Sequence, residues 1–170
     1  MNTTDGSSSD VVMRLATAAD LPDLDTVRQA AFAPVFASFR SILGEEIYAL
    51  AQAPEDEAQG QLLISLFAPE SGWSVYAAEI EDAVIGFVSI QLNLDARVGE
   101  IGLNAVHPNY AGRGVGTTMY KFAIERMKEA GMKVATVATG GDPSHAPARR
   151  AYEKAGFAVQ IPSVWLCQQL

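Results

Sequence analysis

Hydrophobic and polar positions along the chain follow two periods, and each period predicts one type of element. Residues 11–15 alternate with the period of two that is typical of a strand with one buried face. Further strands are predicted at 73–80, 84–94, 98–106, 133–138, 157–161 and 164–169. Helices are predicted at 20–32, 35–43, 45–53, 59–67 and 115–130, the last of them clearly amphipathic.

Turn-forming residues separate these elements. Pro54 and Pro69 interrupt the helical region, Glu81 and Asp82 join two strands as a hairpin turn, and Gly131 ends the long helix. The order is one strand, several helices, three consecutive strands, and then helices alternating with strands. This order predicts an α/β fold with a mixed (α+β-type) sheet of about seven strands and helices on both faces.

A glycine-rich turn lies between the strand at 98–106 and the helix at 115–130. It contains Gly112, Gly114 and Gly116. The first N–H groups of a helix lack partners, and the helix dipole favours negative charge there, so such a turn predicts an anion site. A glycine cluster is also compatible with an ordinary tight turn.

Three kinds of phosphate-binding loop compete for this turn. A P-loop requires a lysine before Ser or Thr, and none precedes Thr117. A dinucleotide loop requires a third small residue where Thr117 stands and an acidic residue about twenty positions on, but residues 133–137 are Lys-Val-Ala-Thr-Val. The third kind is the pyrophosphate loop [QR]-x-x-G-x-[GA] of the GNAT acetyltransferase superfamily. Residues 111–116 resemble it, except that Ala111 replaces Gln or Arg.

A second motif follows downstream, at residues 146–157. A short helix is predicted there, with Ser144 or His145 as its cap, Pro147 in its first turn and Gly156 just past its end. Its apolar face consists of Ala148, Ala151, Tyr152 and Ala155. The pattern A-x-x-x-Y-E-K-x-G-F is similar to a GNAT signature, and the two motifs together extend the resemblance over residues 73–170.

The resemblance implies a GNAT-like acyl-CoA N-acyltransferase fold and activity. Acetyl-CoA would be the co-substrate, with no metal, and its acetyl group would pass directly to a primary amine. In this family pantetheine pairs with the edge of the fourth strand, and a main-chain N–H there faces the thioester oxygen. The implied cofactor-binding residues are Asn104, Ala105, Val106, Ala111, Gly112, Arg113, Gly114, Val115, Gly116, Thr117, His145 and Tyr152. A non-catalytic module that binds or senses acyl-CoA is the alternative.

Two residues are candidates for the proton transfers of this chemistry. Tyr152 is the expected acid for the departing thiolate, because the family's tyrosine at this position stands beside the cofactor sulfur. Glu100 is the expected base, because alternation along its strand places it on one face with Gly102 and Asn104. Glu79 is the alternative base. Tyr152 could instead only pack against pantetheine, and Glu100 could be a solvated surface carboxylate.

Composition indicates the cellular compartment and the domain organisation to expect. The chain has 170 residues, 49% of them hydrophobic, and a single cysteine, Cys167, which favours a reducing compartment. No apolar run is long enough to span a membrane, and the polar residues 1–9 predict a disordered tail before one domain at 10–170. His107 and His145 lack the spacing of a metal site. A cytoplasmic enzyme, monomeric or homodimeric, is therefore expected.

The distribution of charged residues along the chain indicates the kind of acceptor to expect. A net charge of −8 argues against nucleic acid as a partner. No acidic residue lies in 107–118 or 143–152, which carry Arg113, Arg149 and Arg150. A basic cofactor slot in an acidic protein favours a cationic acceptor, either a small-molecule amine or a protein amine. The residues expected on the acceptor side are Glu45, Glu46, Glu79, Phe36, Phe39 and Tyr48.

Overall fold

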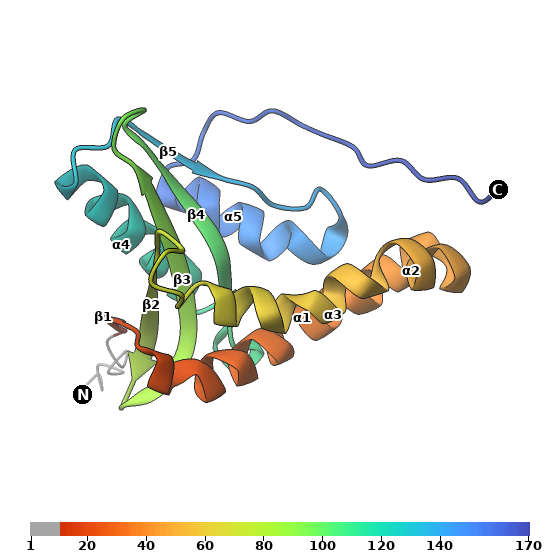
Figure 1. The fold of residues 1–170 in the computed structure, drawn as a ribbon, viewed down its shortest axis with the longest axis horizontal. Helices are drawn as coiled ribbons and strands as arrows, with labels where there is room; N and C mark the ends of the chain where they lie inside the picture. The colour runs from red at the N-terminus through yellow and green to blue at the C-terminus, as the bar shows by residue number, and fades with distance from the viewer. Residues whose placement is uncertain (1–10) are drawn as a thin grey trace, which may run out of the picture.

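A five-stranded mixed sheet forms the centre of the computed structural model, which describes residues 11–170 (Figure 1). The predicted tail at 1–9 lies outside the described residues. The strands follow each other across the sheet in the order β1 (Val12–Leu15), β2 (Trp73–Ile80), β3 (Ala83–Asn93), β4 (Val98–Val106) and β5 (Val134–Val137). The first four are antiparallel, and β5 runs parallel to β4. The predicted hairpin turn is confirmed, since Glu81 and Asp82 both have positive φ.

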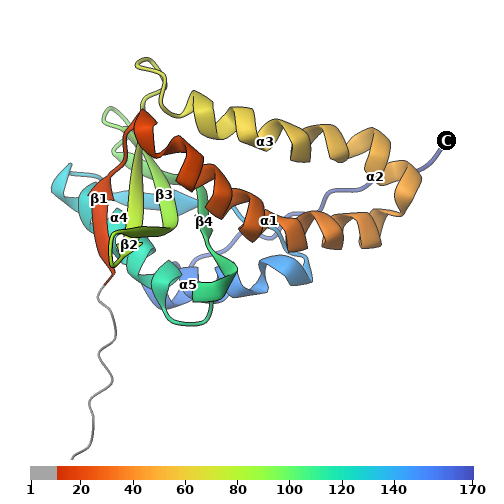
Figure 2. The same cartoon turned by 90° about the horizontal axis from the view of Figure 1, so that it is seen from below.

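Helices cover both faces of the sheet, as predicted (Figures 1 and 2). One face carries α1 (Leu21–Leu43) and α3 (Ala53–Ser65), which are joined by α2 (Glu45–Ala51). The opposite face carries α4 (Val115–Glu129) and α5 (Ala146–Ala155). Phe87 and Leu24 are fully buried in the first layer, and Met119 and Ile101 in the second. We call these the α1 face and the α4/α5 face.

Two predicted helix boundaries are wrong. Residues 20–32 and 35–43 form the single helix α1, which continues through Pro34. The proline removes one hydrogen bond, but it is exposed, and the buried stripe from Leu24 to Val35 continues past it. Pro54 does not end a helix either, because it sits in the first turn of α3, where its missing N–H costs nothing.

The last two predicted strands are not formed. Residues 157–161 and 164–169 have no strand structure, so the sheet has five strands within residues 11–170 where about seven were expected. The apolar pattern indicates strand propensity, but a strand requires a partner, and this segment pairs with none. It leaves the end of α5 and runs to α2, where the Gln169 side chain donates to Glu46 over 2.7 Å.

A bulge in the middle of β4 determines what each face of that strand presents. Val88 of β3 pairs with Asn104, and Ile90 pairs with Ile101. Between these two pairs β4 therefore has one residue more than β3, which is a β-bulge. Gly102 therefore faces Trp73, and Leu103 packs in the layer on the α1 face. Asn104 then points to the α4/α5 face, where it meets Tyr120 and Tyr152.

The pairing of β4 with β5 ends at the same place. It extends from Val98 opposite Val134 to Ile101 opposite Val137, and no further. Beyond Ile101 the two parallel strands separate (Figure 1). The backbone of β4 from residue 102 to residue 106 is thus left without a strand on that side, directly after the bulge.

Candidate active site

The glycine-rich turn forms an open helix N-terminus. Gly112 and Gly114 have φ values of 76° and 83°, and Gly114 is the N-cap residue of α4. No side chain caps this end of the helix, so the first-turn N–H groups are available to an anion. Val115 is buried and anchors the turn to the core. The backbone geometry therefore fits a phosphate group.

Arg113 supplies the positive charge of this turn. Its guanidinium carbon lies 5.4 Å from the centre of the Tyr110 ring, in a cation–π arrangement that leaves the side chain exposed. Ala111 is exposed as well and has no polar side chain, so the groups of residues 111–116 that could donate to an anion are the backbone N–H groups and Arg113. Gly116 differs from the other two glycines, because its φ is not positive and an added Cβ would make ordinary contacts, the nearest with Ala151 at 3.6 Å, where the other two have open space.

Asn104 joins two buried tyrosines beside the point where the strands separate. Its side-chain nitrogen donates to the Tyr152 hydroxyl over 3.0 Å, and its side-chain oxygen accepts from the Tyr120 hydroxyl over 2.8 Å. The two rings are stacked with their centres 4.3 Å apart. Sequence reasoning assigned only the backbone of Asn104 to the site and missed Tyr120, although Tyr120 follows the glycine turn by one helical turn.

Burial controls the ionisation of both phenols. It raises the pKa of Tyr152, and the hydrogen bonds from Tyr120 and Asn104 oppose that shift only in part. Burial also raises the pKa of Tyr120, with a further contribution from Tyr152. Both hydroxyls therefore stay protonated at neutral pH, which is the form that can donate a proton.

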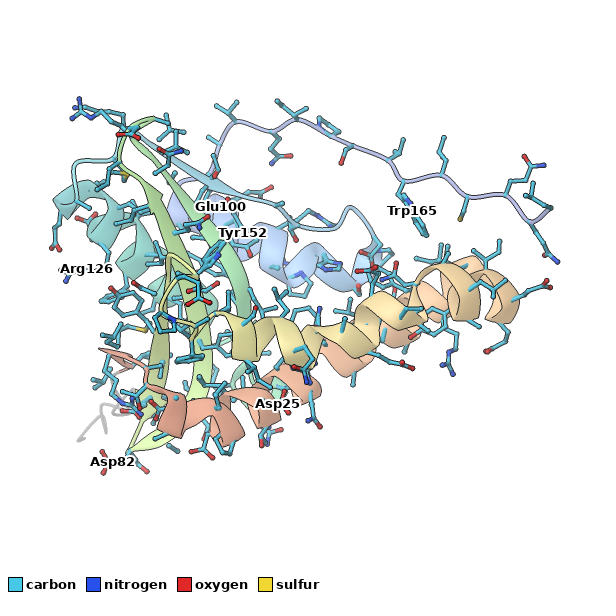
Figure 3. All side chains as sticks on the ribbon, viewed as in Figure 1. Asp25, Asp82, Glu100, Arg126, Tyr152 and Trp165 are labelled. Atoms are coloured by element: carbon cyan, nitrogen blue, oxygen red, sulfur yellow. The ribbon has the colours of Figure 1, made fainter. Side chains whose placement is uncertain are left out.

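Glu100 lies on the other face of β4. Its neighbours Gly99 and Ile101 face the α4/α5 side, Gly99 against Met127, so Glu100 faces the α1 side together with Gly102. The predicted grouping of Glu100 with Asn104 on one face is wrong, because the bulge reverses the alternation between them. Glu100, labelled in Figure 3, is exposed. Its Cα lies opposite Thr136 of β5.

The alternative base, Glu79, is already engaged. The guanidinium of Arg14 contacts its carboxylate at 2.6 Å, and the same guanidinium bonds Asp20. Glu79 also lies two strands away from β4, where β2 pairs with β1. It is therefore less suited than Glu100 to take a proton beside the separated strands.

His145 belongs to a dense polar cluster after β5. The carboxylate of Asp142 accepts four hydrogen bonds, from the Ser38 hydroxyl, from the backbone and hydroxyl of Ser144, and from His145 Nδ1 at 2.5 Å. The imidazole also stacks on Phe39 of α1 with ring centres 5.8 Å apart. This cluster ties the loop between β5 and α5 to α1 and fixes the orientation of the His145 ring.

The expected acceptor side contains α2, but not all of its predicted residues are free. Tyr48 is buried, donates to Asp56 over 2.8 Å, and has the Arg40 guanidinium 4.7 Å above its ring. Its ring is therefore already occupied by a cation of the protein itself. Glu45 and Glu46 remain exposed, although Arg40 lies 3.9 Å from Glu45 and the Gln169 side chain donates to Glu46.

Metal-binding clusters and membrane-spanning helices are both absent from the described part of the chain. Between residues 11 and 170, no group of three or more His, Cys, Asp or Glu side chains is arranged to hold a metal ion. No helix in that range is both long and apolar enough to cross a membrane.

A helix end without a side-chain cap thus lies beside a separated pair of parallel strands, with a buried phenol at the junction. The sequence profile described as Acetyltransferase (GNAT) family matches residues 36–157. The chain belongs to this family.

Solved structures share the fold at low sequence identity. The PaiA N-acetyltransferase from Thermoplasma acidophilum in complex with coenzyme A is 20% identical, with 91% of this chain and 93% of that chain covered and a TM-score of 0.69. An aminoglycoside acetyltransferase from an uncultured soil metagenomic sample, in complex with sisomicin, is 15% identical over 94% and 96% of the chains (TM-score 0.58). A ribosomal-protein-alanine N-acetyltransferase from Brucella melitensis biovar Abortus 2308 is 18% identical over 94% and 100% (TM-score 0.56). No curated protein matches the sequence.

The Asp142 cluster predicts a pH-dependent contribution to stability. Burial acts to raise the pKa of Asp142, but hydrogen bonds from Ser144 and His145 outweigh it and lower the pKa to about 2. A folded-state pKa below the unfolded value of about 3.9 stabilises the fold above pH 4 and loses this effect as the pH falls towards 2. Asp142→Asn should therefore cost about 2 kcal/mol at pH 7 and progressively less below pH 4.

Urea unfolding between pH 3 and pH 7 measures this difference. Asp95→Asn, in an exposed turn, is the matched control and should change the free energy of unfolding by less than about 0.5 kcal/mol. An Asp142→Asn variant as stable as the wild type at pH 7 would contradict the stabilising role of the Asp142 carboxylate.

Proposed function

We propose that this protein transfers the acetyl group of acetyl-CoA directly to a primary amine. The observation that carries the proposal is the bulge in β4, which places Tyr152 and Asn104 on one face of the strand and Glu100 on the other. Direct transfer requires a proton donor on the side of the departing thiolate and a proton acceptor on the side of the entering amine. Tyr152 on the α4/α5 face would be the proton donor, and Glu100 on the α1 face would be the proton acceptor.

The cofactor side is the α4/α5 face. The N–H groups of residues 115–117 and the Arg113 side chain would bind the pyrophosphate, because this helix end has no side-chain cap. The free backbone of β4 at 104–106 would hydrogen-bond the pantetheine arm as an added strand does. His145, held by Asp142, would contact the same arm.

Acetyl-CoA supplies the activated acyl group, and residues of the chain would stabilise the developing negative charge and transfer protons. A main-chain N–H near Asn104 would stabilise the negative charge that develops on the carbonyl oxygen. Tyr152 would give its proton to the sulfur as the carbon–sulfur bond breaks, and would be protonated again from solvent. The attacking nitrogen, already deprotonated once by Glu100, would release its second proton to solvent as the amide forms. Asn104, which bonds the Tyr152 hydroxyl, would hold it in place.

The amine side is the α1 face. An amine is an ammonium ion at neutral pH, and it must lose a proton before it attacks the carbonyl carbon. Glu100, exposed on this face, would take that proton directly or through a water molecule. The exposed Glu45 and Glu46 would attract a cationic acceptor. Structures with this fold include enzymes named for aminoglycosides and for a ribosomal protein, so both kinds of amine are candidates.

Release of free thiol from acetyl-CoA with a panel of acceptors tests the proposal. The panel contains polyamines, amino sugars, amino-acid derivatives and peptides with a free α-amine, and matched alcohols and carboxylates serve as controls. Thiol release should depend on a primary amine. Tight acetyl-CoA binding without turnover on any amine would support a sensing module instead, and turnover on alcohols alone would also contradict the proposal.

Substitution of Gly114 should abolish coenzyme A binding. In Gly114→Glu the side chain brings bulk and negative charge to the helix end that would hold the pyrophosphate. Gly131→Glu is the matched control, since Gly131 has a similar φ of 79° at the opposite end of α4 and also has open space around it. Calorimetry should find no binding in the first variant and near-native affinity in the second. Near-native affinity in Gly114→Glu would remove this turn from the cofactor site.

Removal of the Tyr152 hydroxyl should slow turnover without weakening cofactor binding. Tyr152→Phe should lower kcat on the order of 10²-fold, because the thiolate loses its proton donor, while acetyl-CoA affinity hardly changes. Tyr76→Phe, on β2 against Phe122, is the control and should keep the wild-type kcat. An unchanged kcat in Tyr152→Phe would show that the ring only packs.

The pH profile separates the two candidate bases. The rate should rise with pH as the free amine forms, and Glu100→Gln should depress the lower part of that profile, where a base is needed most. At high pH the amine is already deprotonated, so the variant should approach the wild type. Glu79→Gln should leave the shape of the profile unchanged. The opposite pattern would assign the role to Glu79.

A further inference from the structure

Three polar side chains form a hydrogen-bonded network between β4, α4 and α5. Tyr120 of α4 and Tyr152 of α5 are 3% and 5% exposed, and Asn104 of β4 bonds both hydroxyls. Tyr152 is the proposed acid, and Tyr120 is a second buried hydroxyl beside it. The direction of each hydrogen bond in such a network determines which proton is available for transfer.

Two neighbours fix the orientation of the Asn104 amide. Its Nδ2 donates over 2.8 Å to the carbonyl oxygen of Gly102, which can only accept a hydrogen bond. Its Oδ1 accepts from the Tyr120 hydroxyl over 2.8 Å. If the amide turned over, Oδ1 would face the Gly102 carbonyl, and two acceptors would stand against each other. The amide therefore has one favourable orientation.

This orientation sets the direction of the hydrogen bond to Tyr152. The second hydrogen of Asn104 Nδ2 donates to the Tyr152 hydroxyl over 3.0 Å, so Tyr152 is the acceptor in this bond. The contact from the Tyr152 hydroxyl to Asn104 Oδ1 is longer, at 3.4 Å, and Oδ1 already accepts from Tyr120. Among residues 11–170 the Tyr152 proton has no closer acceptor than this. The proton is thus available to a group outside the network.

We propose that Tyr120 is a positioning residue that keeps the Tyr152 proton available for the departing sulfur, because it occupies Asn104 Oδ1. This role rests on the proposed function, in which Tyr152 is the acid. As the carbon–sulfur bond breaks, its electron pair goes to the sulfur and the Tyr152 proton moves to that sulfur. Asn104 Nδ2 then donates to the phenolate. This donor is in place before the proton leaves, so no side chain has to reorient.

The ionisation of Tyr152 agrees with this direction of bonding. Burial raises the pKa of Tyr152, and hydrogen bonds from Tyr120 and Asn104 act against that rise. Both neighbours therefore stabilise the phenolate that forms when the proton leaves. A Tyr152 hydroxyl that donated to Asn104 would have the opposite effect, because that bond would hold it in the protonated form.

Packing keeps the Tyr120 hydroxyl at Asn104. The rings of Tyr120 and Tyr152 are stacked with their centres 4.3 Å apart. Tyr120 lies in the second turn of α4, and a Cβ added to Gly116 would be 3.7 Å from its ring. The helix whose first N–H groups would bind the pyrophosphate thus also carries the residue that orients Asn104.

The substitution Tyr120→Phe tests this role, because it removes the hydroxyl and keeps the stacked ring. Asn104 Oδ1 can then accept the Tyr152 proton, and this added bond must break in every turnover. With acetyl-CoA and an accepted amine, kcat should fall on the order of tenfold. Acetyl-CoA affinity, measured by calorimetry, should stay near the wild-type value. Tyr76→Phe removes a hydroxyl from the same layer of the protein, and it should keep the wild-type kcat.

The double variant Tyr120→Phe with Tyr152→Phe separates positioning from packing. If Tyr120 acts only through the Tyr152 proton, the double variant should have the kcat of Tyr152→Phe. Independent structural effects would instead multiply and lower kcat by a further factor on the order of ten.

Three results would overturn the role of Tyr120 and leave Tyr152 as the acid. They are an unchanged kcat in Tyr120→Phe, a loss of acetyl-CoA affinity in that variant, and a double variant in which the two effects multiply. An unchanged kcat in Tyr152→Phe would be a different result, since it would contradict the proposed acid itself and the role of Tyr120 with it.

Discussion

The extra residue in β4 is the constraint on which the rest of the site depends. A regular strand would present Glu100, Gly102 and Asn104 on one face. The bulge instead leaves Gly102 against Trp73 and turns Asn104 towards Tyr120 and Tyr152. Pairing with β5 also stops at Ile101, immediately before the bulge. The bulge thus lies where the free edge of β4 begins, and it places Glu100 and Asn104 on opposite faces of the strand.

The surrounding contacts hold this irregularity in place. The Ser89 hydroxyl donates to the carbonyl of Leu103 over 2.9 Å, within the bulge itself, and Ser89 is fully buried. Gly102 must be a glycine, since an added Cβ would lie 2.5 Å from the Trp73 ring. On the other face the two stacked tyrosines satisfy both ends of the Asn104 amide. The bulge is therefore part of the packed core and not a flexible defect.

Local signals in the sequence predicted the elements whose positions depend on nearby residues. The helix at 146–155 has its expected left-handed Gly156, and Ala148, Ala151, Tyr152 and Ala155 pack as its buried face. The anion-compatible start of α4 follows in the same way from its glycines. The opposite faces of Glu100 and Asn104 could not be predicted, because both faces of β4 are covered: Ile101 packs on the α4/α5 face and Leu103 and Ala105 on the α1 face, so apolar residues recur at every second position across the bulge. Residues 157–170 look like strands locally, but whether a strand forms depends on a partner edge, which local pattern does not specify. Tyr120 was missed because its importance arises from Asn104, sixteen positions away.

Initial-rate kinetics with both substrates varied tests the central claim most directly. If Tyr152 and Glu100 act from opposite faces of β4 on one transfer, acetyl-CoA and amine must be bound together. The double-reciprocal plots for a series of fixed amine concentrations should then intersect. Parallel lines would contradict the account, because they indicate a ping-pong reaction in which the enzyme itself carries the acetyl group between two separate steps.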